Sequence, residues 1–261
     1  MIDGKGHRIT VHEPLANCVL LNVSEVANVD IRGITLLFNH APACDPLGEC
    51  PPAIHVSRST AITLDDVTIL KSPGTGLKVE RVADAFLRRV RVEEAGLIGI
   101  YVGPWRGEGP DRKSRYVTVE ESSVARSDVN GIAFVDVEGS IGKPSSILNT
   151  TFTGNHRFGR FPSPSGRPYN GGQAYLLRAD NVVLRGNTFS ESHCPICDNT
   201  DVWDVELGPG PLGAVTLTEN HFGGHHSWAI YVNDGTLFGA PPIVTRNTLG
   251  HGKSLGNLPP S

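Results

Sequence analysis

Apolar and polar residues alternate along this chain with a period of two, and the alternation recurs in units that align without gaps. In a unit of 16 residues, apolar side chains occupy relative positions 1, 3, 9, 11 and 16. A period of two is typical of strands, whereas an amphipathic helix gives a period of about 3.6. Four ungapped copies lie at residues 21–36, 54–69, 77–92 and 174–189. The pattern therefore predicts a repeat protein of short strands and turns.

The unit recurs four more times when insertions are allowed within it. These copies begin at Ile100, Ile132, Trp203 and Ile230, and a partial copy covers residues 2–11. The shortest spacing between copies is 23 residues, as between Ile54, Leu77 and Ile100. No helical pattern intervenes, so three short strands per repeat are expected to stack in parallel at about 4.8 Å per turn of a solenoid. Inward residues such as Leu184 and Phe189 are expected to form its core.

Glycine and asparagine recur at fixed places in the repeat. Gly76, Gly99 and Gly131 precede first strands, Asn28 and Asn181 occupy one turn, and Asn187, Asn220 and Asn247 occupy another. At these positions the chain resembles the right-handed parallel β-helix of the pectin-lyase-like superfamily, whose repeat reads G-I-x-V-x-x-S-x-N-V-x-I-x-x-N-x-F. The resemblance implies an all-β fold, a single-stranded right-handed parallel β-helix of about nine rungs with three short parallel sheets. We interpret the second asparagine column as structural.

The repeat covers nearly the whole chain, which indicates a single domain over residues 1–261. Repeats occupy about 2–249, and residues 250–261 are expected to form a short polar tail. The terminal rungs of a solenoid expose core and unpaired strand edges. Since no cap is evident in the sequence, we expect further domains or partner subunits, as in an oligomer, to cover the ends.

Charge and hydropathy exclude some classes of partner. The formal net charge is −4 with a pI near 6.2, so no basic field is present to hold nucleic acid or an anionic membrane surface. No run of 18 apolar residues predicts a membrane span, and the residues after Met1 lack the pattern of a signal peptide. We expect a soluble extracellular or periplasmic protein whose leader is not visible in this sequence.

Five cysteines are too few for a disulfide scaffold. Cys44 and Cys50 share one proline-rich loop, where a local disulfide is the favoured interpretation. Cys194 and Cys197 have the C-x-x-C spacing of a zinc half-site, with a disulfide, free thiols or a loop staple as alternatives.

Two metals are therefore candidate cofactors. Zinc at Cys194 and Cys197 would draw further ligands from His193 or from His221, His225 and His226. Calcium would need clustered carboxylates, for which Asp198, Asp201 and Asp204 are the candidates. No second half-site of regular spacing accompanies the cysteines.

Insertions into the minimal repeat indicate where function lies, because folding does not require them. They fall at 37–53, 153–173 and 190–202 before first strands, and at 103–116, 135–146, 206–214 and 233–241 after them. Both sets flank the face made by the first strands, which predicts a walled trough from rung five onward. Alternation places one outward column on its floor: Asn22, His55, Lys78, Tyr101, Ala133, Tyr175, Asp204 and Tyr231.

An acidic pair between two tyrosines is the best cluster on this floor. Asp204 is expected between Tyr175 and Tyr231, with Glu206 two residues along the strand. The resemblance implies that the trough binds an extended polysaccharide, through aromatic stacking on sugars and basic contacts to uronate carboxylates. The substrate-binding candidates are Lys78, Tyr101, Trp105, Arg157, Arg160, Tyr175 and Arg178.

Two reactions suit these residues. Hydrolysis needs two carboxylates about 5 to 9.5 Å apart, which Asp201, Asp204 and Glu206 can supply. Lysis needs a base and a cation that stabilises an enolate, for which Tyr231, His226, Arg178 or Lys78 are candidates. The segment 199–205 also resembles the Asn-Thr-Asp segment of polygalacturonases. It departs from that pattern at residues 226–229, which lack the paired aspartate, and in the missing Arg-x-Lys.

The sequence therefore predicts a carbohydrate-active protein, either a polysaccharide lyase or a glycoside hydrolase. The alternative is a non-catalytic glycan-binding or structural module of a larger or trimeric surface assembly.

Overall fold

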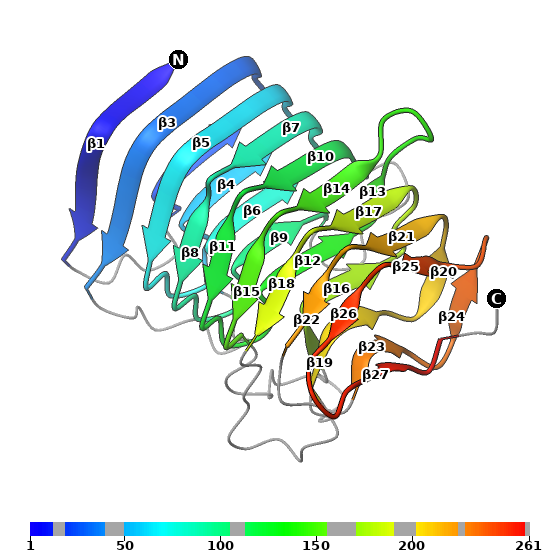
Figure 1. Cartoon of the computed structure of the whole chain (residues 1–261). Coiled ribbons are helices and arrows are strands. Elements are labelled where there is room, and N and C mark those ends of the chain that lie inside the picture. Colours follow the sequence, from blue (N-terminus) through cyan, green and yellow to red (C-terminus); the bar gives the residue numbers. More distant parts are fainter. Residues whose placement is uncertain are drawn as a thin grey trace.

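The computed structural model describes residues 1–12, 19–39, 50–104, 113–155, 171–190, 202–223 and 228–258. Within these ranges the regular secondary structure consists of strands alone, and every pairing between named strands is parallel. Figure 1 shows successive turns of the chain stacked side by side, from β1 at the N-terminal end to β27. The parallel β-helix expected from the repeat is confirmed.

The first strands of the repeat form one sheet of nine strands. In spatial order these are β2 (Leu21–Ser24), β4 (Ile54–Ser57), β6 (Leu77–Glu80), β9 (Ile100–Val102), β12 (Ile132–Val135), β16 (Gly171–Leu177), β19 (Val202–Leu207), β23 (Trp228–Val232) and β27 (Ser254–Gly256). We call the side of this sheet that faces away from the solenoid core the outer face.

The second and third strands form two further ladders. The second strands are β1 (Ile2–Val11), β3 (Ala27–Phe38), β5 (Thr60–Leu70), β7 (Ala83–Arg88), β10 (Ser114–Glu120), β13 (Val137–Glu138), β14 (Ser145–Leu148), β17 (Val182–Arg185), β21 (Val215–Thr218) and β25 (Ile243–Thr245). The third strands are β8 (Arg91–Glu93), β11 (Ser123–Ala125), β15 (Thr151–Thr153), β18 (Thr188–Ser190), β22 (His221–Phe222) and β26 (Thr248–Leu249).

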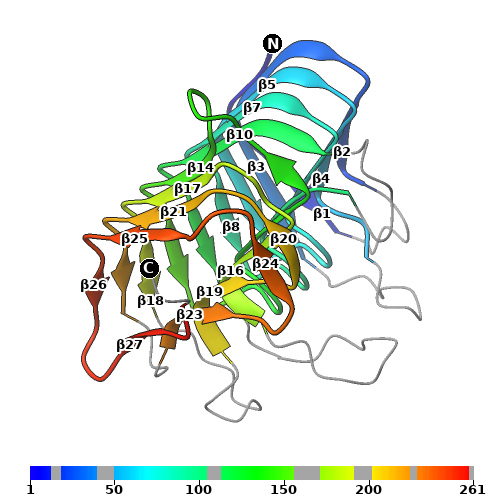
Figure 2. The ribbon, with the colours of Figure 1, turned by 90° about the vertical axis from the view of Figure 1, so that its right-hand side faces the viewer.

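These two ladders are joined into a single 16-stranded sheet, a detail that the expectation of three separate sheets did not include. The cause is β5, which runs through the corner without a break and pairs first with β7 and then with β8. An additional pair of strands, β20 (Gly210–Leu212) and β24 (Thr236–Phe238), comes from two of the insertions after first strands. Both lie at the C-terminal end of the solenoid (Figures 1 and 2).

Inward side chains stack in columns along the solenoid axis. Phe152, Phe189 and Phe222 are fully buried, and successive ring centroids lie 5.0 and 5.3 Å apart. Gly76 must lack a side chain, because a Cβ there would lie 2.6 Å from the carbonyl oxygen of Gly99 on the next rung. The repeat thus encodes both the filling of the core and the close approach of its turns.

The asparagine column is a hydrogen-bonded ladder, as predicted. The backbone N–H of Asn187 donates to Oδ1 of Asn220, and that of Asn220 donates to Oδ1 of Asn247. Each side-chain amide also donates to a backbone carbonyl of the preceding rung, as Asn220 does to Leu184 at 3.0 Å. Since Asn187 and Asn220 are fully buried, these bonds satisfy backbone groups at the turn.

Residues with positive φ at equivalent turns of adjacent rungs form ion pairs. Arg58 pairs with Glu25, Arg178 with Asp136, and Arg246 with Glu219, and all six have φ between 47° and 59°. These pairs link neighbouring rungs at the solenoid surface.

The tail differs from its expected form. Instead of being only a short polar extension, it contains β27, which pairs with β23 through Trp228 with Ser254 and Ile230 with Gly256. Asn257 then caps the edge of β23, since its side chain accepts from the Val232 N–H at 2.7 Å and donates to the Val232 carbonyl at 2.9 Å. The first-strand ladder therefore extends beyond the last recognised repeat.

Candidate functional site

Strand register decides which residues meet on the outer face. Val205 pairs with Ala174 on one side and with Ile230 on the other, so Glu206 lies directly between Tyr175 and Tyr231. The prediction that Asp204 occupies this place is wrong by two residues. The sequence pattern aligns Trp203 with Ala174, whereas Val205 is its true partner. Both alignments give the same alternation of apolar and polar residues, because a shift of two residues does not change which residues are expected to face inward.

Asp204 is buried and does not face solvent on the outer face. Its side chain is 0% exposed and forms an ion pair with Lys253, whose side chain is 1% exposed. Nε2 of Gln173 donates to Asp204 Oδ1 at 3.3 Å, and Asn155 donates to Gln173 Oε1 at 3.4 Å. Asp204 therefore belongs to a buried polar chain at the corner that leads into the first strands.

Glu206 is a buried carboxyl group on the outer face, and its pKa is raised. The residue is 3% exposed, and the Asn233 side chain donates to its Oε1 at 3.2 Å. Its Oε2 is buried without a hydrogen-bond partner among the described residues. Burial raises the pKa of Glu206 from its ordinary 4.5 to about 8, and the Asn233 bond opposes this only in part. Glu206 is therefore largely protonated at neutral pH.

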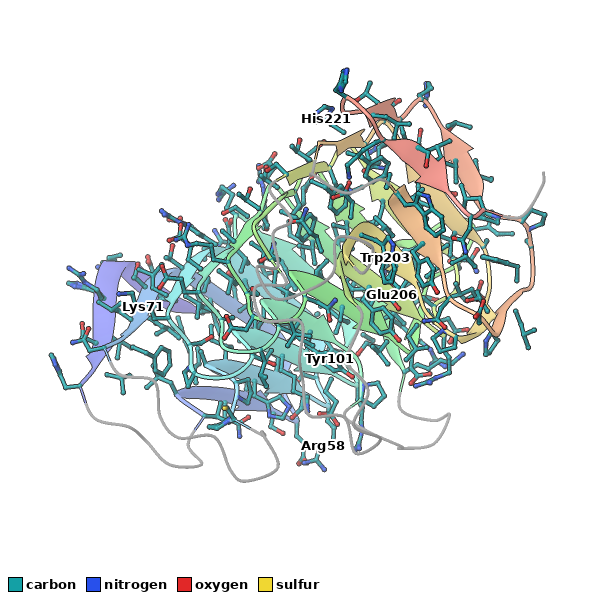
Figure 3. The ribbon with its side chains drawn as sticks, turned by 90° about the horizontal axis from the view of Figure 1, so that it is seen from below. Arg58, Lys71, Tyr101, Trp203, Glu206 and His221 are labelled. Atoms are coloured by element: carbon teal, nitrogen blue, oxygen red, sulfur yellow. The ribbon has the colours of Figure 1, made fainter. Side chains whose placement is uncertain are left out.

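An aromatic stack lies next to Glu206. The rings of Trp203 and Tyr231 are nearly parallel with centroids 3.8 Å apart, and Trp228 lies 6.2 Å from Tyr231 at an interplanar angle of 16°. Trp203 is buried, whereas Trp228 is 41% exposed. In Figure 3 Trp203 and Glu206 lie close together on this side of the ribbon. The stack therefore presents one indole to solvent beside a protonated carboxyl.

The centre of the outer face is covered, which corrects the prediction of an open floor there. Tyr101, Ala133 and Val135 form a second hydrophobic cluster, against which Tyr175 and Leu177 pack. Tyr101 is 7% exposed, and its hydroxyl donates to the Pro104 carbonyl at 2.7 Å. A row of apolar side chains on an outward column is stabilised by removal from water. Tyr101 is labelled in Figure 3 on the same side as Glu206.

Lys78 belongs to a separate ionic cluster near the N-terminal end. Glu80 Oε2 lies 2.7 Å from Lys78 Nζ and 3.4 Å from His55 Nε2, and Arg81 lies 3.6 Å from its other oxygen. The close contact with His55, assisted by Lys78, lowers the pKa of Glu80 to about 2. Three strands of the sheet, β9, β12 and β16, separate β6 from β19, so the structure does not bring Lys78 to Glu206.

Arg178 lies at the turn after β16, close to the tyrosines of the outer face. It makes a two-point ion pair with Asp136, with both distances 2.7 Å. This pairing raises the pKa of Arg178, and the charge field of Tyr175 and Tyr101 adds to the effect. The guanidinium is 42% exposed and keeps a face toward solvent.

Several predicted residues lie outside the described ranges: Asp201, His226, Trp105, Arg157 and Arg160. The same holds for Cys44, Cys194, Cys197, Asp198, His193 and His225, so the zinc and calcium hypotheses stay predictions. Cys50 is disulfide-bonded. His221, the one zinc candidate that is described, contacts the Thr248 hydroxyl at 2.9 Å. The described residues contain no cluster of metal-binding side chains.

Sequence reasoning missed Trp203, Trp228 and Lys253. Both tryptophans lie two residues before a paired inward residue, Val205 and Ile230, so register places them at the same level of neighbouring strands. Strand alternation would turn both side chains inward, and it therefore does not predict their stacking on Tyr231. Lys253 lies in the tail, outside the repeat, and no pattern in the sequence signals its burial.

Comparison with known proteins addresses the fold. No family model and no curated protein matches the chain. It is similar to PfbA, a surface adhesin of Streptococcus pneumoniae, with a TM-score of 0.53 and 13% identity over 90% of this chain and 72% of that one. Together with the parallel ladders, this likeness settles the architecture. The chain has the parallel β-helix fold.

Two enzymes are also similar to this β-helix protein. One is the alginate lyase of a Paenibacillus species, with a TM-score of 0.45 and 7% identity over 90% of this chain and 93% of that one. The other is the A-module of mannuronan C-5 epimerase AlgE4 of Azotobacter vinelandii, with a TM-score of 0.38 and 10% identity over 97% and 89%. A fold does not determine an activity, so the function must be argued from the site.

Proposed function

We propose that this protein is carbohydrate-active and binds an extended polysaccharide on the C-terminal part of the outer face, over β16, β19 and β23. The observation that carries the proposal is the buried carboxyl of Glu206, set between Tyr175 and Tyr231 and beside the Trp203, Tyr231 and Trp228 stack. A sugar ring offers an apolar face to an aromatic ring and hydroxyl groups to polar neighbours. This face supplies both kinds of partner.

Trp228 is the platform on which we place a sugar. Its exposed ring is backed by Tyr231, so a sugar that stacks on it displaces water from a preorganised surface. Arg178, Asn233 and the phenol groups of Tyr175 and Tyr231 provide polar contacts nearby. Trp105, Arg157 and Arg160 remain predicted contacts from the insertions, while Lys78 suits a more distant part of an extended chain.

Glu206 is assigned the role of proton donor. A carboxyl with a pKa of about 8 holds its proton at neutral pH and can transfer it to the oxygen of a departing sugar. The titratable side chains that face it from the flanking strands are the phenols of Tyr175 and Tyr231. Activity that depends on the proton therefore falls as pH rises through 8.

Elimination fits the described residues better than hydrolysis does. A two-carboxylate hydrolase needs a second carboxylate near Glu206, and Asp204 is committed to Lys253 in the buried corner. Elimination removes the proton next to a uronate carboxylate, breaks the adjacent C–O bond and leaves a C=C bond. Tyr231, in its phenolate form, is then the proposed base that takes this proton, and Glu206 gives its own proton to the leaving oxygen. Asp201 and His226 stay predicted as alternative second groups.

A panel of uronate-containing and neutral polysaccharides tests this proposal. Absorbance of unsaturated products reports elimination, and reducing ends without that absorbance report hydrolysis. Glu206→Gln removes the proton donor but keeps the size of the side chain, so turnover is expected to fall about 100-fold or more while binding persists. Arg246→Met, which breaks an exposed ion pair on the last rung, is the matched control. Equal turnover by the wild type and Glu206→Gln would contradict a catalytic Glu206.

Glycan binding without catalysis is the second candidate function. It is favoured by the stacked aromatic platform, which can hold a sugar without any catalytic group. In the same panel, a protein that only binds glycan migrates more slowly in a gel that contains the polysaccharide and forms no product. We also propose an extracellular location, since the structurally similar PfbA is a surface adhesin. The part of the chain that the structure describes contains no helix long and apolar enough to span a membrane.

A further inference from the structure

The strongest unexplained feature of the molecule is the buried ion pair between Lys253 and Asp204. Both side chains are at most 1% exposed, although Lys253 comes from the tail, where the repeat has ended. Charged groups are rarely buried unless they are paired, and a surface contact would have joined the tail to the solenoid with less desolvation. We therefore looked to this ion pair for a role beyond attaching the tail to the solenoid.

The path of the Lys253 side chain crosses one rung. Lys253 directly precedes β27, which pairs with β23, whereas Asp204 lies on β19, one strand further into the sheet. Register places Ala229 of β23 between Asp204 and the tail, and its small side chain is fully buried. A long side chain can pass an alanine at this position, where a larger residue would obstruct it.

Asp204 connects this contact to the candidate site. It directly follows Trp203, whose ring stacks on Tyr231, and it precedes Glu206 by two residues. On its other side it accepts from Gln173 of β16, the strand that also carries Tyr175. The ammonium of Lys253 therefore pairs with a carboxylate that links two strands of the site. These are β19, which carries Trp203 and Glu206, and β16, which carries Tyr175.

We propose that Lys253 is a positioning residue of the glycan site, acting through Asp204 to hold β19 in the place where Trp203 meets Tyr231 and Glu206 is kept from water. Residues 250–258 are then a strap that completes the site, anchored by Lys253 at one end and by Asn257 on β23 at the other. Figures 1 and 2 show β27 lying along β23 at the C-terminal end. This inference rests on the proposed function for its biological role, but its structural readouts require no glycan.

Lys253→Met tests the proposal, with near-UV circular dichroism of the stacked aromatic pair and the NMR titration of the Glu206 carboxyl as readouts. The expected results are a weaker aromatic band, a Glu206 pKa lower by about one unit or more as water enters, and glycan affinity lower by about tenfold. Leu64→Ala, in the buried core of β5, is the control for lost stability. All variants are compared at a temperature where each is folded.

A cycle with Asp204→Asn separates positioning from mere stabilisation. If Lys253 acts through Asp204, Lys253→Met has little further effect on the Glu206 pKa in the Asp204→Asn background. An equal effect in both backgrounds, an unchanged Glu206 pKa in Lys253→Met, or the same shift in Leu64→Ala overturns the inference. A wild-type protein that binds no glycan overturns the proposed function instead, since the pKa and the aromatic band are measured without glycan.

Discussion

Glu206 and Tyr231 are directly paired on β19 and β23, so a carboxyl that keeps its proton lies one rung from a stacked phenol. Because strand pairing fixes this relationship, it does not depend on the conformation of a loop. The backbone of two adjacent rungs thus holds the acid and the aromatic platform together.

The free energy of unfolding should depend on pH through the Glu206 carboxyl. In the unfolded chain it titrates near 4.3, whereas in the folded protein its pKa is about 8. Between these values the unfolded chain loses a proton that the folded protein keeps, so stability falls as pH rises from about 4.5 to 8 and is level above it. The full change is on the order of 5 kcal/mol. Urea unfolding at pH 5 and pH 8.5 measures most of it. Glu206→Gln is expected to remove this part of the slope, and an identical slope in the variant would contradict the raised pKa.

Trp228 should contribute directly to glycan affinity. Trp228→Ala removes an exposed ring backed by Tyr231, and affinity is expected to fall about tenfold, equivalent to about 1.4 kcal/mol. Calorimetric titration with the best polysaccharide of the panel measures this. Phe86→Ala is the control, because Phe86 is similarly exposed at 37% but lies on β7 in the other large sheet. Equal losses in the two variants would argue against a platform at Trp228.

The asparagine ladder should matter for stability without affecting chemistry. Asn220→Ala leaves the Asn187 N–H and the Leu184 carbonyl without their partner in the buried turn. A loss of about 2 to 4 kcal/mol is expected, because each buried unsatisfied group costs about 1 to 3 kcal/mol. Thermal unfolding measures it, with Asn22→Ala at an exposed position as the control. A variant as stable as the wild type would show that water replaces the amide.

The fold could be predicted from sequence because its determinants are local and repeated. Alternation identifies each strand, Gly76 marks a turn where a Cβ would clash, and Asn187, Asn220 and Asn247 recur at one turn. Because the same pattern recurs in every rung, a wrong strand assignment in one copy does not change the predicted architecture.

The site could be predicted only in part. The outward column was correct from Asn22 to Tyr175, but Trp203 was aligned where Val205 belongs, since a two-residue shift preserves alternation. Glu206 was identified as a candidate but was assigned the wrong neighbours. Nor does the sequence reveal that Tyr101 is covered, because an outward tyrosine reads the same whether or not other residues pack on it.

Burial of Lys253 could not have been predicted at all. Lysine in a tail rich in glycine and proline is ordinarily exposed, and the pairing with Asp204 depends on a strand, β27, that follows no repeat. Contacts of this kind arise from tertiary structure, because the Lys253 side chain extends past β23 to reach Asp204 on β19.

The most direct test of the account is an NMR titration of the Glu206 carboxyl in selectively labelled protein, assigned with Glu206→Gln, without and with a bound polysaccharide. We predict a pKa of about 8 in the free protein and a change of that pKa when glycan binds. A pKa near 4.5 in the free protein, or a titration that saturating glycan leaves unchanged, would contradict the placement of Glu206 at the centre of the site.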